Sequence, residues 1–215
     1  MKILKYVISA FVALFLSISA SANEKGHFGI RASYNTTTAT NESVITGWGS
    51  GFSIGANYYS NLSKKIFFQT GLAFYIDNIR LDGTTDNKYN PRTFDGNIRT
   101  MGLSIPFDFG VKVLNSKPVS LGVYTGPKLF FNIDSKIICD YKYNSTSTHL
   151  NEDFTTSGME VGWGLGIGAD LFKKWHVNIE GVYNLSKFGE TELFDSAKKT
   201  KLRRAGISVG IGYNF

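Results

Sequence analysis

Cysteine is almost absent from this sequence: Cys139 is the only one among 215 residues. A single cysteine excludes an intramolecular disulfide and a cysteine-based metal cluster, and Cys139 is most simply a residue at a strand tip. The GxSxG, phosphate-loop and HExxH motifs are absent as well. The repeated Gly-x-Gly of residues 162–168 lacks the strand-to-helix context of a nucleotide site. We therefore predict no cofactor and no metal site.

No stretch of the chain concentrates positive charge. The formal net charge is +6, and removal of the two lysines in the N-terminal leader described below lowers it to about +4. Without a basic cluster, the sequence offers no footprint for nucleic acid, so we predict no nucleic-acid partner. The mild basicity fits contact with anionic lipid head groups.

The first 22 residues have the pattern of a secretory signal peptide. Lys2 and Lys5 give a positive start, residues 6–16 form an apolar centre, and Ala20-Ser21-Ala22 is a small-residue cleavage site. A membrane-anchoring helix needs about 20 apolar residues, and this run is too short. We expect cleavage after Ala22, with Ala20 and Ala22 as the recognised small residues.

Long apolar runs are missing from the remaining residues, 23–215. No later run approaches the length of a transmembrane helix. If this part of the chain spans a membrane, it must therefore do so as a closed β-barrel, which is the other structure that satisfies its backbone in hydrocarbon.

The closing stretch, residues 203–215, supports such a barrel. Counting back from Phe215, every second residue is apolar or aromatic, and the alternate set is small or polar. A period of two predicts a β-strand with one oily face and one small, wettable face. Glycines cannot fill a core, so we expect the oily face to point into lipid. A lipocalin-like soluble barrel with the oily set inside is the alternative fold.

Eight segments share this alternation, which predicts an all-β fold: an eight-stranded antiparallel up-and-down transmembrane β-barrel over residues 23–215. The segments cover approximately residues 27–35, 48–60, 65–80, 98–113, 119–138, 158–172, 175–188 and 203–215. Pro106 lacks a ladder donor, so we expect a local irregularity or a bulge there. In the fifth segment we expect Asp134 to point inward.

Connections between the segments alternate in length. Short turns at 61–64, 114–117 and 173–174 follow the even-numbered segments. Long polar loops follow the odd-numbered ones, at about 36–47, 81–97, 139–157 and 189–201. In bacterial barrels the short turns face the periplasm, so we predict an integral outer-membrane protein with four longer extracellular loops and both termini in the periplasm.

An eight-stranded barrel has room inside only for side chains or one small ligand. The register places eight charged residues inward, four of each sign: Arg31, Lys112, Lys128, Arg204, Asp108, Glu160, Asp170 and Glu180. Unpaired charges in a narrow lumen are costly, so we expect them to pair or stay hydrated. Counted in residues from the short-turn end of each segment, their positions predict two clusters. The middle cluster contains Arg31, Asp108 and Glu180, and the outer cluster contains Lys128, Glu160 and Arg204. Such clusters would close the lumen, and a gated polar pathway is the alternative.

The later segments resemble the PorT-like, OmpA-like family of outer-membrane β-barrels. The resemblance rests on five features: Leu103-Ser104-Ile105-Pro106-Phe107, Gly126-Pro127, the glycines 162, 164, 166 and 168, Tyr183-Asn184-Leu185, and the closing strand that ends in Tyr213-Asn214-Phe215. It implies an outer-membrane location and assembly by the barrel-insertion machinery, which recognises a terminal aromatic such as Phe215, with Tyr213 beside it. Its motifs describe barrel construction and name no activity.

Catalysis has little support. Some small outer-membrane barrels are lipid-modifying enzymes that use a His and a Ser near the outer lipid face. Among the histidines, only His149 has serines close in sequence, Ser145 and Ser147, in a loop rich in Ser, Thr and Asn. We predict a non-enzymatic monomer that acts as a structural or surface-interaction platform, in contact with outer-membrane lipid and lipopolysaccharide and with a protein partner at the extracellular loops. The alternative function is a small pore for ions or small solutes.

Overall fold

The computed structural model describes residues 26–40, 47–84, 93–116, 118–143, 146–172, 174–191 and 200–215. The predicted signal peptide, with Ala20 and Ala22, lies outside the described residues, so its cleavage stays a prediction. None of the described residues belongs to a helix that is long and apolar enough to cross a membrane.

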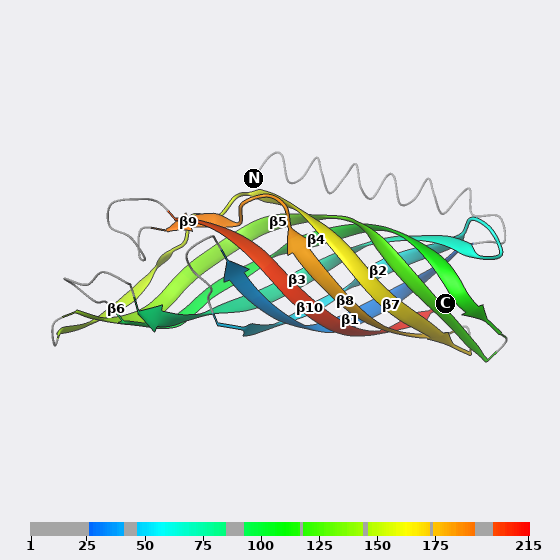
Figure 1. Cartoon of the computed structure of the whole chain (residues 1–215), viewed down its shortest axis with the longest axis horizontal. Helices are drawn as coiled ribbons and strands as arrows, with labels where there is room; N and C mark the ends of the chain where they lie inside the picture. Colours follow the sequence, from blue (N-terminus) through cyan, green and yellow to red (C-terminus); the bar gives the residue numbers. More distant parts are fainter. Residues whose placement is uncertain are drawn as a thin grey trace.

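The described chain consists almost entirely of antiparallel strands. They are β1 (Gly26–Thr40), β2 (Gly49–Asn61), β3 (Ile66–Thr84), β4 (Thr93–Asn115), β5 (Val119–Tyr143), β6 (Thr146–Asp153), β7 (Met159–Leu171), β8 (Trp175–Asn184), β9 (Gly189–Thr191) and β10 (Thr200–Asn214). Figure 1 shows them as one long, tilted sheet that curls around its own axis.

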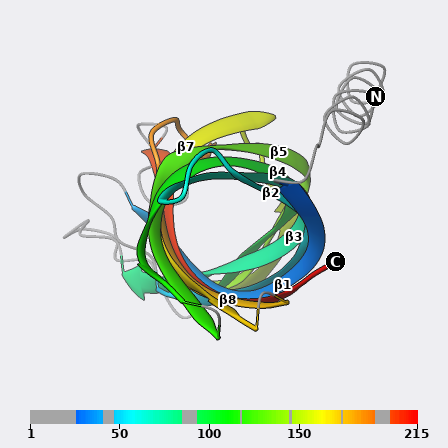
Figure 2. The same cartoon turned by 90° about the vertical axis from the view of Figure 1, so that its right-hand side faces the viewer.

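Eight of the strands close into a ring, which confirms the predicted barrel. Of the ten strands in the sheet, β6 pairs only with β5 and β9 only with β10, so the other eight form the wall. The first and last strands of the ring pair over their length, from Gly29↔Asn214 to Thr40↔Arg203. Viewed along the axis, the ribbons enclose a circular outline (Figure 2).

The wall of the barrel has apolar side chains outside and small or charged ones inside. On β10, Ile207, Val209 and Ile211 are 46%, 54% and 52% exposed, whereas Arg204 is 3% exposed. On β7 the buried positions alternate with Trp163, Leu165 and Ile167, which point outward. We call this outward apolar surface the apolar band. The lipocalin-like alternative is therefore wrong for this part of the barrel, because its oily face is outside.

The expected irregularity at Pro106 is an interruption of the pairing, with no partner on β3 for Pro106 and none on β5 for the two residues after it, and it contains no bulge. The pairing between β4 and β5 keeps the same register on both sides of it, from Pro106↔Lys128 to Phe109↔Thr125. The proline carbonyl accepts a hydrogen bond of 2.8 Å from the hydroxyl of Thr70. The proline thus removes a single ladder donor without inserting a residue.

The register shifts instead between Met101 and Gly102, and again between Lys112 and Leu114. The first shift leaves one extra residue on β5, which exchanges the two faces of the strand above it. Ser135, Ile137 and Cys139 are buried as a result, and Asp134 pairs with Met101 on the outer side. The inward placement of Asp134 and the strand-tip placement of Cys139 are therefore both wrong.

In two of the predicted loops, at 81–97 and 139–157, most of the residues that the structure describes are in strands. The strands β4 and β5 have 23 and 25 residues, whereas a tilted strand needs only ~9–11 to cross a bilayer. At this end β4 pairs with β3 as far as Thr84↔Thr93 and with β5 as far as Thr93↔Lys142. The strand β5 also pairs with β6, from Lys136↔Asp153 to Tyr143↔Thr146. Figure 1 shows these strands projecting at the end that carries β6 and β9, opposite the short turns. We call this part of β3 to β6, beyond the apolar band, the outer extension.

Candidate functional site

The middle of the lumen holds a buried cation between two carboxylates. Lys128 on β5 places its Nζ 2.6 Å from Oε1 of Glu180 and 3.8 Å from Oδ2 of Asp108. All three side chains are buried. Their strands β4, β5 and β8 bring them together because each contributes an inward position at the same height. One ammonium thus compensates two carboxylates across the barrel.

Arg31 reaches this middle cluster through a neutral side chain. Its Nη2 donates a hydrogen bond of 3.5 Å to Oε1 of Gln69, and Nε2 of Gln69 donates one of 3.0 Å to Oδ2 of Asp108. Arg31, Asp108 and Glu180 therefore lie in one cluster. The placement of Lys128 in the outer cluster is wrong. The stagger between neighbouring strands brings it level with Asp108 and Glu180, closer to the short turns than the residue count predicted.

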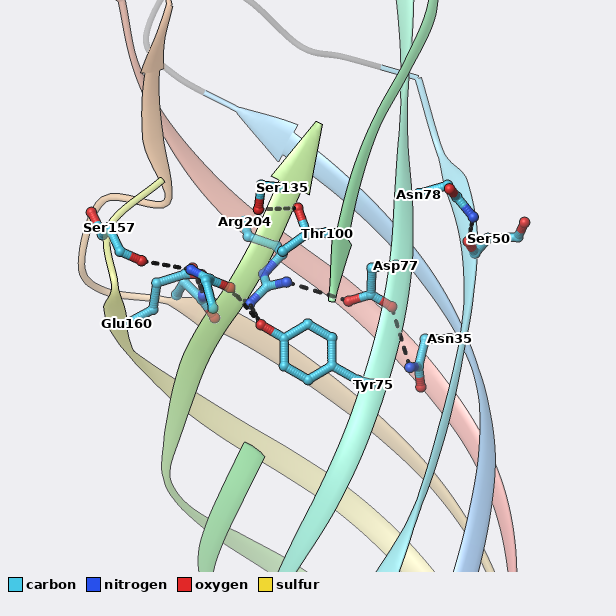
Figure 3. Close-up of polar contacts among 12 residues, drawn as sticks. Asn35, Ser50, Tyr75, Asp77, Asn78, Thr100, Ser135, Ser157, Glu160 and Arg204 are labelled. Carbon is cyan, nitrogen blue, oxygen red and sulfur yellow. Dashed lines mark hydrogen bonds and ion pairs between the residues drawn. The ribbon is translucent and has the colours of Figure 1, made fainter. Parts of the chain in front are cut away.

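The outer cluster is organised around Arg204 on β10, at the centre of Figure 3. Its Nη2 lies 2.9 Å from Oε1 of Glu160, and its Nη1 lies 3.4 Å from Oδ2 of Asp77. The same Nη2 donates a hydrogen bond of 3.3 Å to the hydroxyl of Tyr75. The guanidinium also lies 4.9 Å from the ring centroid of Phe130 and 5.3 Å from that of Phe188. It therefore combines ion pairs with aromatic contacts.

Glu160 is fully buried, and neutral donors complete its coordination. Asn132 donates a hydrogen bond of 2.7 Å to Oε1 of Glu160, and Asn184 donates one to Oε2. On the other side of the cluster, Asn35 donates a hydrogen bond of 3.3 Å to Oδ1 of Asp77 (Figure 3). These partners matter because a buried carboxylate is tolerated only when its hydrogen bonds are made.

Below the middle cluster, toward the short turns, aromatic rings cross the lumen. Tyr59, Phe67 and Tyr124 form a buried cluster, which we call the aromatic floor. The rings of Tyr59 and Phe67 stack with centroids 5.0 Å apart. Glycines make room for them, because a Cβ on Gly110 or Gly166 would overlap the ring of Phe67 or Tyr124. The rings of Phe67 and Tyr124 thus account for the glycines at 110 and 166.

At the other end, inside the outer extension, the lumen is filled by apolar side chains. The buried cluster, which we call the apolar cap, consists of Ala39, Ile79, Leu81, Ile98, Ile137, Cys139, Phe154, Phe188 and Leu202. The rings of Phe154 and Phe188 lie 5.6 Å apart. Backbone bonds fix Phe188 in place: its N–H donates to the carbonyl of Leu202 over 2.7 Å, and its carbonyl accepts from Ser157 over 2.8 Å.

The outer extension therefore reverses the polarity of the barrel wall. Its inward residues are apolar, and its outward residues include the exposed Asn97, Arg99, Lys136 and Asp140. This is the arrangement of a water-soluble sheet, with the oily face covered. The outward face of the outer extension therefore suits contact with water rather than with lipid.

Between the floor and the cap the structure has a polar cavity of about 140 Å³. Its lining takes in both charged clusters, with Arg31, Lys128, Glu180 and Arg204 among the residues that face it. A space of this size holds a few water molecules. The lumen is therefore a short polar chamber with an apolar or aromatic barrier at each end.

Two of the three described histidines, His149 and His176, pair with aspartates, and the third, His27, stacks on the ring of Tyr59 with centroids 4.9 Å apart. His176 Nδ1 lies 2.7 Å from Oδ1 of Asp170 within the lumen, and His149 Nδ1 lies 2.7 Å from Oδ1 of Asp140 on the surface. Ser145 lies outside the described residues, so the arrangement of a serine beside His149 stays untested. Among the residues that the structure describes, no group of three or more His, Cys, Asp or Glu side chains is arranged to hold a metal ion.

The closing aromatics lie at the short-turn end. The rings of Trp175 and Tyr213 meet edge to face at 5.2 Å, and those of Tyr213 and Phe215 at 5.7 Å. The N–H of Phe215 donates to the carbonyl of Phe28 over 2.8 Å, and the side chain of Phe215 is 76% exposed. Phe215 is thus fixed through its backbone, and its ring stays largely exposed beside Tyr213.

Two members of the outer cluster were not predicted. Asp77 and Tyr75 lie on the inward face of β3. The alternation of that segment carries the signal, because Gln69, Gly71 and Asp77 share one face with Tyr75. The two bulky aromatics on the inward face, Phe67 and Tyr75, obscured it. The apolar cap had no such signal, because its residues follow a register shift or lie in predicted loops.

Comparison with known families and structures adds two findings. The family model described as "Outer membrane protein beta-barrel domain" matches residues 19–190. No curated protein sequence matches the chain.

Several solved structures are similar in outline. The attachment invasion locus protein Ail of Yersinia pestis shares 14% identity over 89% of this chain and 99% of its own, with a TM-score of 0.47. The outer membrane protein OprG of Pseudomonas aeruginosa shares 12% over 90% and 97%, with a TM-score of 0.44. Neisserial surface protein A shares 15% over 87% and 97%, with a TM-score of 0.40.

Proposed function

This chain belongs to the family of outer membrane protein β-barrel domains and is integral to the outer membrane, and we propose that it acts there as a non-enzymatic surface platform. The observation that carries the proposal is the outer extension. Three wall strands, β3, β4 and β5, continue past the apolar band, β6 adds to them as a fourth, and the apolar cap fills the space behind this sheet. A sheet with a packed interior holds its outer side chains in fixed positions, which suits recognition of a partner.

The proposal includes the orientation and the assembly of the barrel. Both termini lie in the periplasm, and residues 23–215 form the mature barrel as a monomer. The exposed ring of Phe215 serves the barrel-insertion machinery, and lipid with lipopolysaccharide surrounds the apolar band. The strand around Ile105-Pro106 and the terminal Phe215 support placing the chain near the PorT-like, OmpA-like barrels. The partner at the outer extension is a protein or another surface molecule.

Labelling of intact cells tests the platform. His149 on β6 is exposed, and Lys64 is exposed at a short turn. In a Cys139→Ser background, we expect His149→Cys to react with a membrane-impermeant maleimide on intact cells. The control, Lys64→Cys, should react only after the outer membrane is permeabilised. The reverse pattern, with Lys64→Cys labelled on intact cells, would contradict the proposed orientation and the platform with it.

A small pore remains the second candidate, and the polar cavity is the observation that favours it. The cavity of about 140 Å³ is lined by charges of both signs, as a solute pathway would be. The aromatic floor and the apolar cap oppose this reading, because each fills the lumen with side chains. Single-channel conductance separates the two functions.

A further inference from the structure

Exposed basic side chains lie around the outer surface where the apolar band ends. Arg99 on β4 lies two residues before the outward Met101, and Arg203 on β10, on the opposite side of the ring, lies two residues before the outward Ala205. Lys136 on β5 is exposed at the same border. In a bilayer, the head groups lie at the ends of the hydrocarbon layer. These cations therefore stand at the depth of the lipid head groups.

Arg99 and Lys136 form an unusual pair within this group. They lie directly opposite each other in the β4–β5 ladder. Like charges in directly opposite positions repel each other and destabilise a sheet. Within the described residues, neither side chain makes a hydrogen bond, an ion pair or a ring contact. The pair is therefore two adjacent cations without a partner in the chain itself.

The acidic neighbours do not neutralise the pair. Asp153 lies opposite Lys136 on β6, and Asp134 lies opposite Met101, one step toward the band. Neither carboxylate is within ion-pair distance of Arg99 or Lys136. The donors of Arg99 and Lys136 are therefore available to an added anion.

We propose that Arg99 and Lys136 together bind one phosphate group of the phosphorylated glycolipid in the outer leaflet. Directly opposite residues have Cβ atoms about 4.5–5.5 Å apart, so their long side chains can converge on one group. A guanidinium donates two parallel hydrogen bonds to phosphate, and an ammonium adds a point charge. The phosphate removes the repulsion between the two cations. This inference rests on the proposed orientation, in which the outer extension faces the cell exterior.

Native mass spectrometry of the refolded full chain tests the site. The lipids are bisphosphorylated lipid A, its dephosphorylated form and phosphatidylethanolamine, each added at the same concentration. The variant is Arg99→Gln/Lys136→Gln, and the matched control is Lys64→Gln/Lys65→Gln, two exposed lysines at a short turn. We expect the variant to retain lipid A about tenfold less than the wild type, which corresponds to the loss of charge-assisted bonds. Retention of the other two lipids should not change.

Three results would overturn the inference. The first is equal retention of lipid A by the wild type and the Arg99→Gln/Lys136→Gln variant. The second is an equal loss in the Lys64→Gln/Lys65→Gln control, which would reduce the effect to net charge. The third is full displacement of lipid A by an equal concentration of inorganic phosphate, which would make the site one for free anions. A heat-modifiable gel shift checks that each variant is folded. Because binding in micelles does not depend on orientation, a failed orientation appears only in the cell-labelling experiment.

Discussion

At the scale of single residues, Arg204 is the residue around which the outer cluster is organised. Its guanidinium is 3% exposed and compensates two buried carboxylates, Glu160 and Asp77. Removal of one partner from such a group leaves charge without compensation in a medium of low dielectric constant. The cost falls on the carboxylates that remain, because they stay buried without their counter-charge.

We expect Arg204→Gln to lower the free energy of unfolding by about 3–5 kcal/mol, because it leaves Glu160 and Asp77 uncompensated. The measurement is urea unfolding of the barrel in lipid vesicles. The neighbouring Arg203 is exposed, so Arg203→Gln should stay within about 0.5 kcal/mol of the wild type. A second change, Glu160→Gln, should recover part of the loss in the Arg204→Gln protein. Equal effects of Arg204→Gln and Arg203→Gln would show that the outer cluster is not what stabilises the lumen.

The sequence identified most of these residues but not their contacts. Alternation places Arg31, Asp108, Glu180 and Arg204 inward, since each stands in a strand with a period of two. Which charge meets which depends on the stagger between strands, and no local pattern encodes that. Lys128 shows the limit: its face was predicted, yet its partners are Glu180 and Asp108, one layer below the expected ones.

At the scale of strands, the register shift on β5 separates two kinds of wall. Below it the lumen is polar, and above it Ile137 and Cys139 turn inward to join the apolar cap. The eight strands could be predicted because lipid imposes one oily face on each of them. The outer extension could not be predicted, because its strands have apolar residues on the inward face and many polar residues on the outward face. A bulge also leaves no signature in composition.

The apolar cap contains its own reporter, because Cys139 is the only cysteine in the sequence. Cys139 is 1% exposed, and Phe188, another member of the apolar cap, is fully buried. We expect Cys139 in the folded wild type to be protected from maleimide. Phe188→Ala should raise the labelling rate by about tenfold, since loss of the ring lowers the cost of local opening. The measurement is the labelling rate of the refolded barrel.

The control for the cap is Phe172→Ala, which removes an exposed ring at the short-turn end. Its labelling rate should equal that of the wild type. If Cys139 in the folded wild type reacted as fast as in the unfolded chain, the cap would not be closed in solution, and the packing behind the outer extension would lose its role.

At the scale of the whole molecule, the lumen is closed twice. The aromatic floor lies near the short turns and the apolar cap lies in the outer extension, with the charged clusters and the cavity between them. Because the two barriers lie in series, removal of either one leaves the other in the path of an ion.

Conductance in planar bilayers tests this arrangement and separates the platform from the pore. We expect the folded wild type to be silent, and Tyr124→Ala and Phe188→Ala to be silent individually, because one barrier remains in each. The double variant should show steady single-channel openings, since the remaining charged side chains can be hydrated. Steady openings of the wild type would favour the pore and make Lys128 and Glu180 candidates for its selectivity. Silence of a folded double variant would show that the ion pairs themselves fill the lumen, so that the barrel is closed along its whole length.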